Sequence, residues 1–152
     1  MVLSVRARGA YTLADFEYSP TAKKLGIDNR VPDDLLPKAR GLVVIANRAL
    51  AKGLRVNSGY RSRALTEAIY AARNPPETPP YAGPGDHSNC EGLDFDRLPG
   101  QDGAAVLEEV AQILRADSVI GPAIRYTLKE GDHLHVGFKG SELVRIGSDD
   151  VA

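Results

Sequence analysis

Apolar side chains recur at steps of three and four between Pro32 and Gly53, a pattern typical of an amphipathic helix. Two shorter helices are expected before it. The first follows Thr12, whose spacing from Asp15 resembles a capping box. The second runs over residues 20–26, with a proline at its first position and a glycine at its end. The first third of the chain is therefore predicted to be helical.

Further along the chain, alternation of apolar and polar residues indicates strands between further helices. Strands are expected at residues 54–58, 92–97, 118–127, 133–138 and 142–146, the last as an edge strand, and helices after Ser62 and from Asp102 to Leu114. Residues 74–86 contain five prolines, which exclude a helix or a central strand and predict a long loop. This order predicts an α+β domain with N-terminal helices and a small, mostly antiparallel sheet.

The composition fits one domain over residues 1–152, with residues 1–10 and 148–152 as flexible tails, and a monomer is expected. The chain has 19 Lys and Arg residues against 20 Asp and Glu, and this balance argues against a nucleic-acid partner. No apolar run approaches the roughly 20 residues that cross a bilayer, so no membrane insertion is expected. The N-terminus lacks the apolar stretch of a signal peptide, which predicts synthesis in the cytoplasm without one.

The histidines are the first candidates for chemistry. His87 precedes Asp94 by seven residues, and His133 and His135 lie together in a late predicted strand. Two histidines and one carboxylate form a sound zinc site that leaves a position for water, which can then attack a carbonyl. Spacing alone leaves open the alternative that these histidines are unrelated residues of the surface and loops.

Metal-assisted hydrolysis also needs a proton acceptor, and two acids flank the late histidines. Residues 133 and 135 share one face of a regular strand, so Asp132 can join them only if the strand begins at His133 or bends there. Glu130 would have to reach the site from a turn. The sequence leaves the choice between Asp132 and Glu130 open.

Residues 57–62, Asn-Ser-Gly-Tyr-Arg-Ser, form the second informative segment. A strand that runs into Gly59 and continues as a helix exposes the side chains at the turn. Arg61 or Arg63 could then offer a forked clamp for a carboxylate. The alternative is an ordinary surface arginine on the first turn of a helix.

Together, four segments resemble the M15 family of zinc peptidases: residues 19–29, residues 56–62, His87 with Asp94, and residues 132–136. This family comprises D-alanyl-D-alanine carboxypeptidases and L-alanyl-D-glutamate endopeptidases of peptidoglycan. The chain is most similar to the short, single-domain branch common in phages and prophages. The resemblance implies a hedgehog/DD-peptidase-like fold and the stem peptide of peptidoglycan as the substrate. It leaves open which bond is cut, and whether the enzyme acts after release by lysis or as a virion-associated protein.

The resemblance also implies a role for each matching residue. One Zn2+ ion would be bound by His87, Asp94 and His135. Asp132 would be the general base, and His133 would stabilise the tetrahedral intermediate. The substrate and its carbonyl would be held by Arg61, with Ser58 and Tyr60 of the same segment contacting the substrate.

The chain departs from the family pattern Ser-x-His-x-x-Gly-x-Ala-x-Asp at three positions, which here hold Gly85, Cys90 and Gly92. Cys90 is the single cysteine, so no intramolecular disulfide can form, and it is interpreted as a buried packing residue. Its place three residues after His87 also allows it to lie near the metal. The departures support an alternative function, a catalytically weakened member that binds cell wall or serves as a virion structural module.

Overall fold

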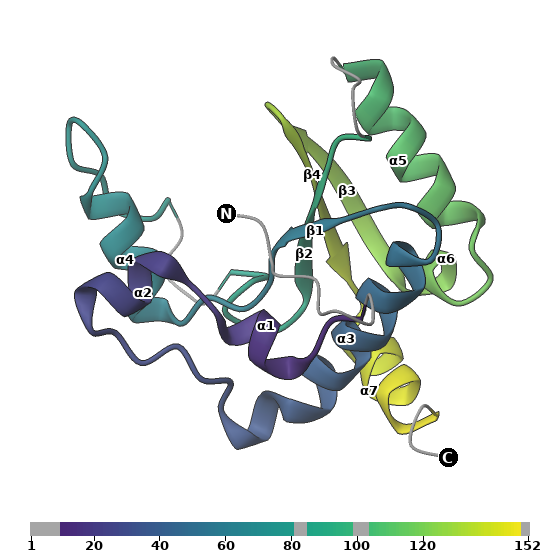
Figure 1. Ribbon diagram of the computed structural model, residues 1–152, viewed down its shortest axis with the longest axis horizontal. Coiled ribbons are helices and arrows are strands. Elements are labelled where there is room, and N and C mark those ends of the chain that lie inside the picture. Colours follow the sequence, from purple (N-terminus) through teal and green to yellow (C-terminus); the bar gives the residue numbers. More distant parts are fainter. Residues whose placement is uncertain (1–9, 81–84, 99–103, 150–152) are drawn as a thin grey trace.

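The structure is a computed structural model that describes residues 10–80, 85–98 and 104–149. A four-stranded antiparallel sheet with strand order β1-β2-β4-β3 lies at its centre (Figure 1). The elements are, in chain order, α1 (Leu13–Glu17), α2 (Pro20–Leu25), the 3-10 helix η1 (Asp33–Leu35), α3 (Leu36–Leu50), β1 (Val56–Ser58), α4 (Arg63–Ala71), β2 (Gly92–Asp96), α5 (Ala104–Ala116), α6 (Ile120–Ala123), β3 (Ile124–Glu130), β4 (His133–Phe138) and α7 (Gly140–Asp149). The predicted α+β fold with a small antiparallel sheet is confirmed. No helix in the described part of the chain is long and apolar enough to span a membrane.

The N-terminal helices begin and end where the sequence predicts. The Thr12 side chain accepts a hydrogen bond from the Asp15 backbone, and the Asp15 carboxylate accepts one from the Thr12 backbone at 2.8 Å. Ser19 caps α2, and Gly26 ends it in the left-handed conformation, with φ of 68°. Both caps satisfy backbone groups that a helix end leaves without an intrahelical partner.

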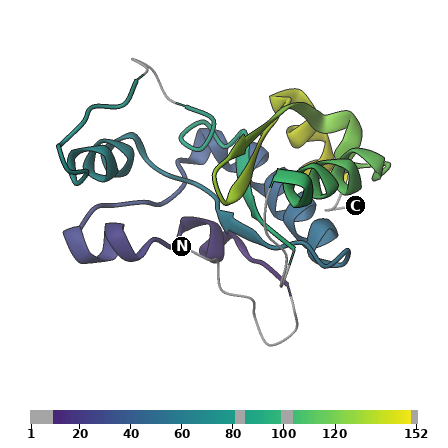
Figure 2. The same ribbon diagram turned by 90° about the horizontal axis from the view of Figure 1, so that it is seen from above.

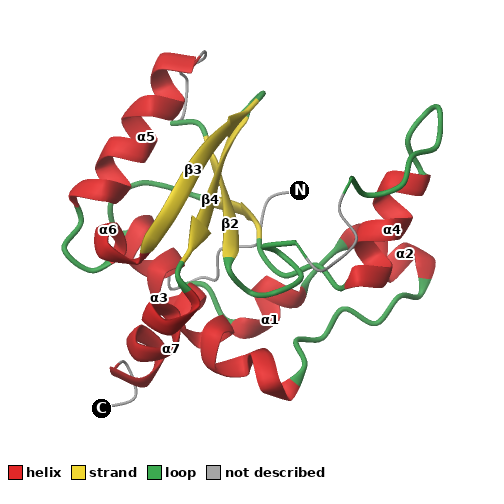
Figure 3. Ribbon diagram, turned by 180° about the vertical axis from the view of Figure 1, so that it is seen from behind, coloured by secondary structure: helices red, strands yellow, loops and turns green. Residues whose placement is uncertain are grey.

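The alternation along β4 separates the two faces of the sheet. Leu134, Val136 and Phe138 are buried in the core, whereas His133 and His135 lie on the opposite face. Helix α5 packs against β3 and β4, and α3 packs against α7. Figures 2 and 3 show α2 and α4 side by side, away from α5 and beyond the sheet. We call these two helices the α2–α4 arm.

Two predicted strands are wrong in part or in whole. Residues 142–146 belong to helix α7 and not to an edge strand, because Leu143 and Ile146 point together into the core beside α3. In the predicted strand 118–127, residues 120–123 form α6, and β3 begins only at Ile124. The predicted tails, the start of the helix at Asp102 and part of the proline-rich loop fall within residues 1–9, 81–84, 99–103 and 150–152, outside the described residues.

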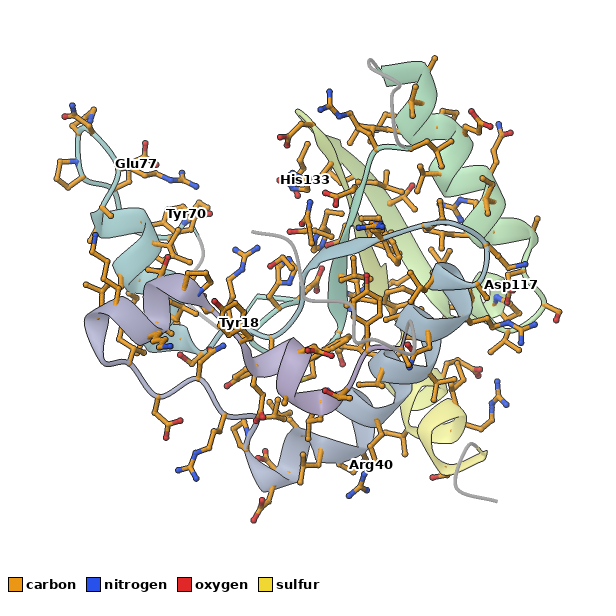
Figure 4. The ribbon with its side chains drawn as sticks, in the orientation of Figure 1. Tyr18, Arg40, Tyr70, Glu77, Asp117 and His133 are labelled. Carbon is orange, nitrogen blue, oxygen red and sulfur yellow. The ribbon has the colours of Figure 1, made fainter. Side chains whose placement is uncertain are left out.

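Asp117 explains why the chain turns into α6 before it enters β3. Its side chain is 1% exposed, and its carboxylate accepts hydrogen bonds of 2.9 Å from the backbone of Val119 and Ile120. Arg48 of α3 and Lys52 in the turn after α3 approach the same carboxylate at 2.6 and 3.1 Å. Figure 4 labels Asp117. Burial opposes ionisation of Asp117, but these hydrogen bonds outweigh it and hold its pKa well below the usual range.

We expect Asp117→Ala to lower the free energy of unfolding by about 2 kcal/mol at pH 7, because backbone N–H groups lose their acceptor. A carboxyl whose pKa is depressed by folding stabilises the protein fully above its unfolded pKa, about 3.9 for Asp. The difference between wild type and Asp117→Ala should therefore shrink as the pH falls below about 4. Urea unfolding at pH 7, 5 and 3 measures this difference. A difference that stays constant over these pH values would contradict the role given to the ionised carboxylate.

Candidate metal centre

The register of the sheet brings distant residues into one row. Asp94 of β2 lies opposite His135 of β4, and Ser58 of β1 lies opposite Asp94. Directly opposed residues of an antiparallel pair point to the same face, so these three side chains are neighbours. His87 reaches them from the turn before β2.

Three side chains direct ligand atoms at a common point. The Asp94 Oδ1 atom lies 3.2 Å from His87 Nε2 and 2.9 Å from His135 Nδ1. These atoms lie within 4.8 Å of one another and could hold a metal ion. Zinc bonds of about 2.0–2.1 Å in a tetrahedron place ligand atoms roughly 3.3 Å apart, which is close to the observed spacing. The structure therefore brings together the three residues that the sequence predicts as ligands.

The second nitrogen of each histidine ring has its own partner. His87 Nδ1 lies 2.7 Å from the carbonyl oxygen of Gly59, and His135 Nε2 lies 2.8 Å from a carboxylate oxygen of Asp86. Both partners are hydrogen-bond acceptors, so each of these nitrogens carries a hydrogen and donates a hydrogen bond. The arrangement is the one found around metal-binding histidines, where an outer hydrogen bond fixes the tautomer and the orientation of the ring.

Charges within the cluster stabilise one another. Burial opposes ionisation of Asp94, but hydrogen bonds from His135 and His87 and the charge of Arg61 hold its pKa well below the usual range. Burial alone would lower the pKa of His135. Hydrogen bonds to Asp86 and Asp94 outweigh this and raise the pKa to about 9. Without a metal, His135 therefore carries a proton on each ring nitrogen at neutral pH, and a metal ion bound at Nδ1 would replace the proton that faces Asp94.

Arg61 lies at the edge of the cluster. Its NH2 group is 3.2 Å from Asp94 Oδ2, and its Nε and NH2 groups donate to the Ser58 hydroxyl at 3.1 and 2.9 Å. The Arg61 side chain is 27% exposed, so part of it is available to a ligand. Ser58 orients Arg61 in this structure, whereas Tyr60 is largely buried in the core and only borders the cleft.

Asn29 holds the turn that carries Arg61, a function that the sequence analysis did not assign. Its amide donates to the carbonyls of Glu17 and Tyr60, at 2.9 and 3.1 Å, and accepts from the backbone of Ser62 at 2.8 Å. The side chain is buried with its polar groups paired, which fixes the turn firmly. This contact joins the segment 19–29 to the segment 56–62 in the structure.

The two acids near the late histidines occupy different environments. Strand β4 begins at His133, and Asp132 lies in the turn with its side chain 81% exposed. Its carboxylate contacts His133 Nδ1 at 3.1 Å. Asp132 does not belong to either group of described side chains that could hold a metal ion. Glu130 is the last residue of β3, opposite His133, and its Oε1 atom lies 3.8 Å from His133 Nε2 and 4.0 Å from His135 Nδ1.

One position that departs from the M15 pattern, Cys90, has a backbone conformation that favours glycine. Cys90 has a φ of 53°, in the left-handed region that favours glycine, which accounts for glycine at the corresponding position of the pattern. Its side chain is buried in the core, and burial raises the pKa of the thiol to about 12. Cys90 is absent from the groups of described residues that could hold a metal ion, so it is a packing residue here.

A cleft runs along both sides of Arg61, Asp94 and His133. One cavity of about 430 Å³ lies toward Tyr126 and the end of α4, and one of about 490 Å³ lies toward α2 and β1. The α2–α4 arm forms the wall opposite the sheet. Figure 4 shows Tyr70 of α4 and His133 facing this space from opposite sides.

In comparisons with known proteins, the chain matches no protein-family model and no curated protein sequence. Any function given to the site therefore depends on the motifs of the sequence and on the geometry described above.

Proposed function

We propose that this protein is a zinc-dependent peptidase that hydrolyses a peptide bond in the stem peptide of peptidoglycan. The observation that carries the proposal is the convergence of His87 Nε2, Asp94 Oδ1 and His135 Nδ1, with each histidine held by an acceptor on its other nitrogen. Two imidazoles and one carboxylate are a donor set that zinc accepts. The choice of a peptidoglycan substrate is supported by the resemblance of the motifs to M15 peptidases.

A bound zinc ion would polarise the scissile carbonyl and lower the pKa of a water molecule. The residues of the chain supply the remaining steps. Arg61, oriented by Ser58, binds the carboxylate or carbonyl oxygen of the peptide beside the metal. The open cleft on both sides of Arg61 leaves room for an extended peptide.

The resemblance implies Asp132 as the general base and His133 as the group that stabilises the intermediate. We instead assign proton transfer to the pair, because the Asp132 carboxylate is 81% exposed and contacts His133. The carboxylate of Asp132 holds His133 Nδ1, so that Nε2 is directed toward Asp94 and Glu130 in the cleft. An imidazole that donates a hydrogen bond from one nitrogen to a carboxylate, and whose other nitrogen faces the substrate, can accept and return a proton. In this assignment Asp132 acts through His133, and Glu130 remains the alternative acid.

Amide replacements should separate the two acids. We expect His133→Gln to lower kcat about 100-fold or more, since proton transfer contributes about 10²–10⁴-fold. Asp132→Asn should lower kcat at least about 10-fold, with zinc content unchanged in both variants. Glu130→Gln, the matched control, should stay within about threefold of wild type. Loss of turnover in Glu130→Gln with normal turnover in Asp132→Asn would assign proton transfer to Glu130 instead.

Purified peptidoglycan tests the proposed function directly. Sacculi are incubated with the protein in the presence of zinc, and with EDTA as a control, and the soluble products are identified by mass spectrometry. We expect zinc-dependent release of products that differ from the substrate by hydrolysis of one stem-peptide bond. The same spectrum distinguishes a carboxypeptidase from an endopeptidase. Binding to sacculi without hydrolysis would instead support the weakened, wall-binding alternative.

A further inference from the structure

Asp86, the acceptor on the outer nitrogen of His135, is a group to which the motifs of the sequence assign no function. It directly precedes His87, and its side chain contacts His135. One carboxylate oxygen, Oδ2, receives the Nε2–H group of His135 at 2.8 Å. The hydroxyl of Tyr126 donates to the same oxygen, and Arg125 donates to Oδ1 at 2.6 Å.

The carboxylate of Asp86 is held in place by charged and polar partners. Its side chain is 16% exposed, and Arg125 pairs with Oδ1 at 2.6 Å. A carboxylate paired with an arginine accepts hydrogen bonds, so Nε2 of His135 is the donor in this contact.

Gly92 shows that the fold makes room for this contact. A Cβ atom at Gly92 would lie 2.7 Å from Asp86 Cβ and 3.1 Å from His135 Cε1, too close for both side chains to remain where they are. The M15 pattern has alanine at this position, whereas this chain has glycine. The exchange to glycine is therefore explained by the presence of Asp86 against His135.

We propose that Asp86 is a positioning residue that fixes the ring of His135 with Nδ1 toward the metal, and that Tyr126 and Arg125 hold its carboxylate for this purpose. The inference rests on the proposed function, because it needs His135 to be a metal ligand. A carboxylate on the outer nitrogen makes the imidazole a stronger donor to the metal. His87 has only a backbone carbonyl in the equivalent place.

The test compares zinc affinity among variants, measured by competition with a chromophoric chelator. We expect Asp86→Ala to bind zinc about 10–100-fold more weakly than wild type, the range typical of such outer partners. Asp86→Asn, which keeps an acceptor but not the charge, should fall between them. Glu91→Ala is the matched control, because Glu91 is near Arg125 at 3.7 Å but has no contact with His135. Its zinc affinity should equal that of wild type.

Two spectroscopic measurements distinguish positioning from a purely structural effect. At saturating cobalt, the visible spectrum of Asp86→Ala should differ from that of wild type and Glu91→Ala, because the orientation of His135 changes. In protein with labelled histidine, the slowly exchanging Nε2–H signal of His135 should be present in wild type and lost in Asp86→Ala. Zinc affinity within twofold of wild type and an unchanged cobalt spectrum would overturn the inference.

Failure of the proposed function gives a different result. If wild type and His135→Ala both take up no zinc, the metal site itself is refuted. The hydrogen bond between Asp86 and His135 is then tested by the Nε2–H signal of His135 in metal-free protein. If that signal persists in Asp86→Ala, the inference is overturned as well. Loss of this signal would leave Asp86 as the group that fixes His135 for another purpose.

Discussion

Replacement of His135 by alanine should reduce bound zinc from one ion per chain to none and abolish hydrolysis of peptidoglycan. His135 provides one of the three side-chain atoms that could hold the ion, and it joins Asp94 to Asp86 within the buried cluster. Loss of a direct ligand should cost more than the roughly 10–100-fold in affinity that an outer partner costs. Zinc content after dialysis, measured by elemental analysis, and product formation from sacculi are the two measurements.

The matched control is His133→Ala, which removes a histidine from the same face of the same strand. His133 Nε2 lies 3.8 Å from Asp94 Oδ2, and His133 belongs with Asp94 and Glu130 to a second group that could hold a metal ion, separate from the group His87, Asp94 and His135. We expect this variant to keep its zinc and lose turnover. Circular dichroism shows whether each variant is folded. If His135→Ala keeps both zinc and wild-type turnover, the ligand assignment is wrong.

The sequence could name His87, Asp94 and His135 as candidate ligands only through the resemblance to M15 peptidases, but their placement in the structure follows from features of short range. Seven residues from His87 to Asp94 allow one turn and one strand, and the alternation in β4 places His133 and His135 on one face. The outer contacts depend on register between strands that lie far apart in the chain. Asp86 contacts His135, which lies 49 residues later in the chain, and no local sequence pattern indicates that these two residues are partners.

The end of β3 is a second feature that the sequence did not predict. The turn to β4 consists only of residues 131 and 132, with Gly131 in the left-handed conformation at φ of 61°. Strand β3 therefore continues to Glu130, three residues beyond the predicted end, and this acid reaches the site from the sheet and not from a loop. Strand boundaries depend on pairing with a neighbour, which periodicity does not reveal.

Helix α7 is the clearest case in which tertiary contact decides the local structure. The segment Glu-Leu-Val-Arg-Ile at residues 142–146 fits a short strand as well as a helix. In the structure α7 packs closely against α3. A Cβ atom on Gly41 of α3 would lie 2.8 Å from Leu143 Cα, and one on Gly147 of α7 would lie 2.9 Å from the Gly41 backbone nitrogen. The two glycines allow this approach, and the burial of Leu143 and Ile146 stabilises it.

The largest loss of stability is therefore expected for Gly41→Ala. Alanine favours a helix over glycine by about 0.5–1 kcal/mol, which alone would stabilise α3. The added methyl group, however, meets the backbone of Leu143, which cannot rotate away as a side chain could. Overpacking of this kind typically costs about 1–3 kcal/mol and occasionally more, and contact with backbone places it at the upper end. We expect a net loss of about 2 kcal/mol or more in the free energy of unfolding, measured by urea denaturation.

Arg40→Ala is the matched control for this prediction, since Arg40 is the neighbouring residue of α3 and is exposed (Figure 4). Surface substitutions of this kind usually change stability by less than about 0.5 kcal/mol. If Gly41→Ala is as stable as Arg40→Ala, α7 does not pack on α3 through Gly41. A stabilised Gly41→Ala would mean that helix propensity alone acts at this position, and would restore the edge strand as an interpretation of residues 142–146.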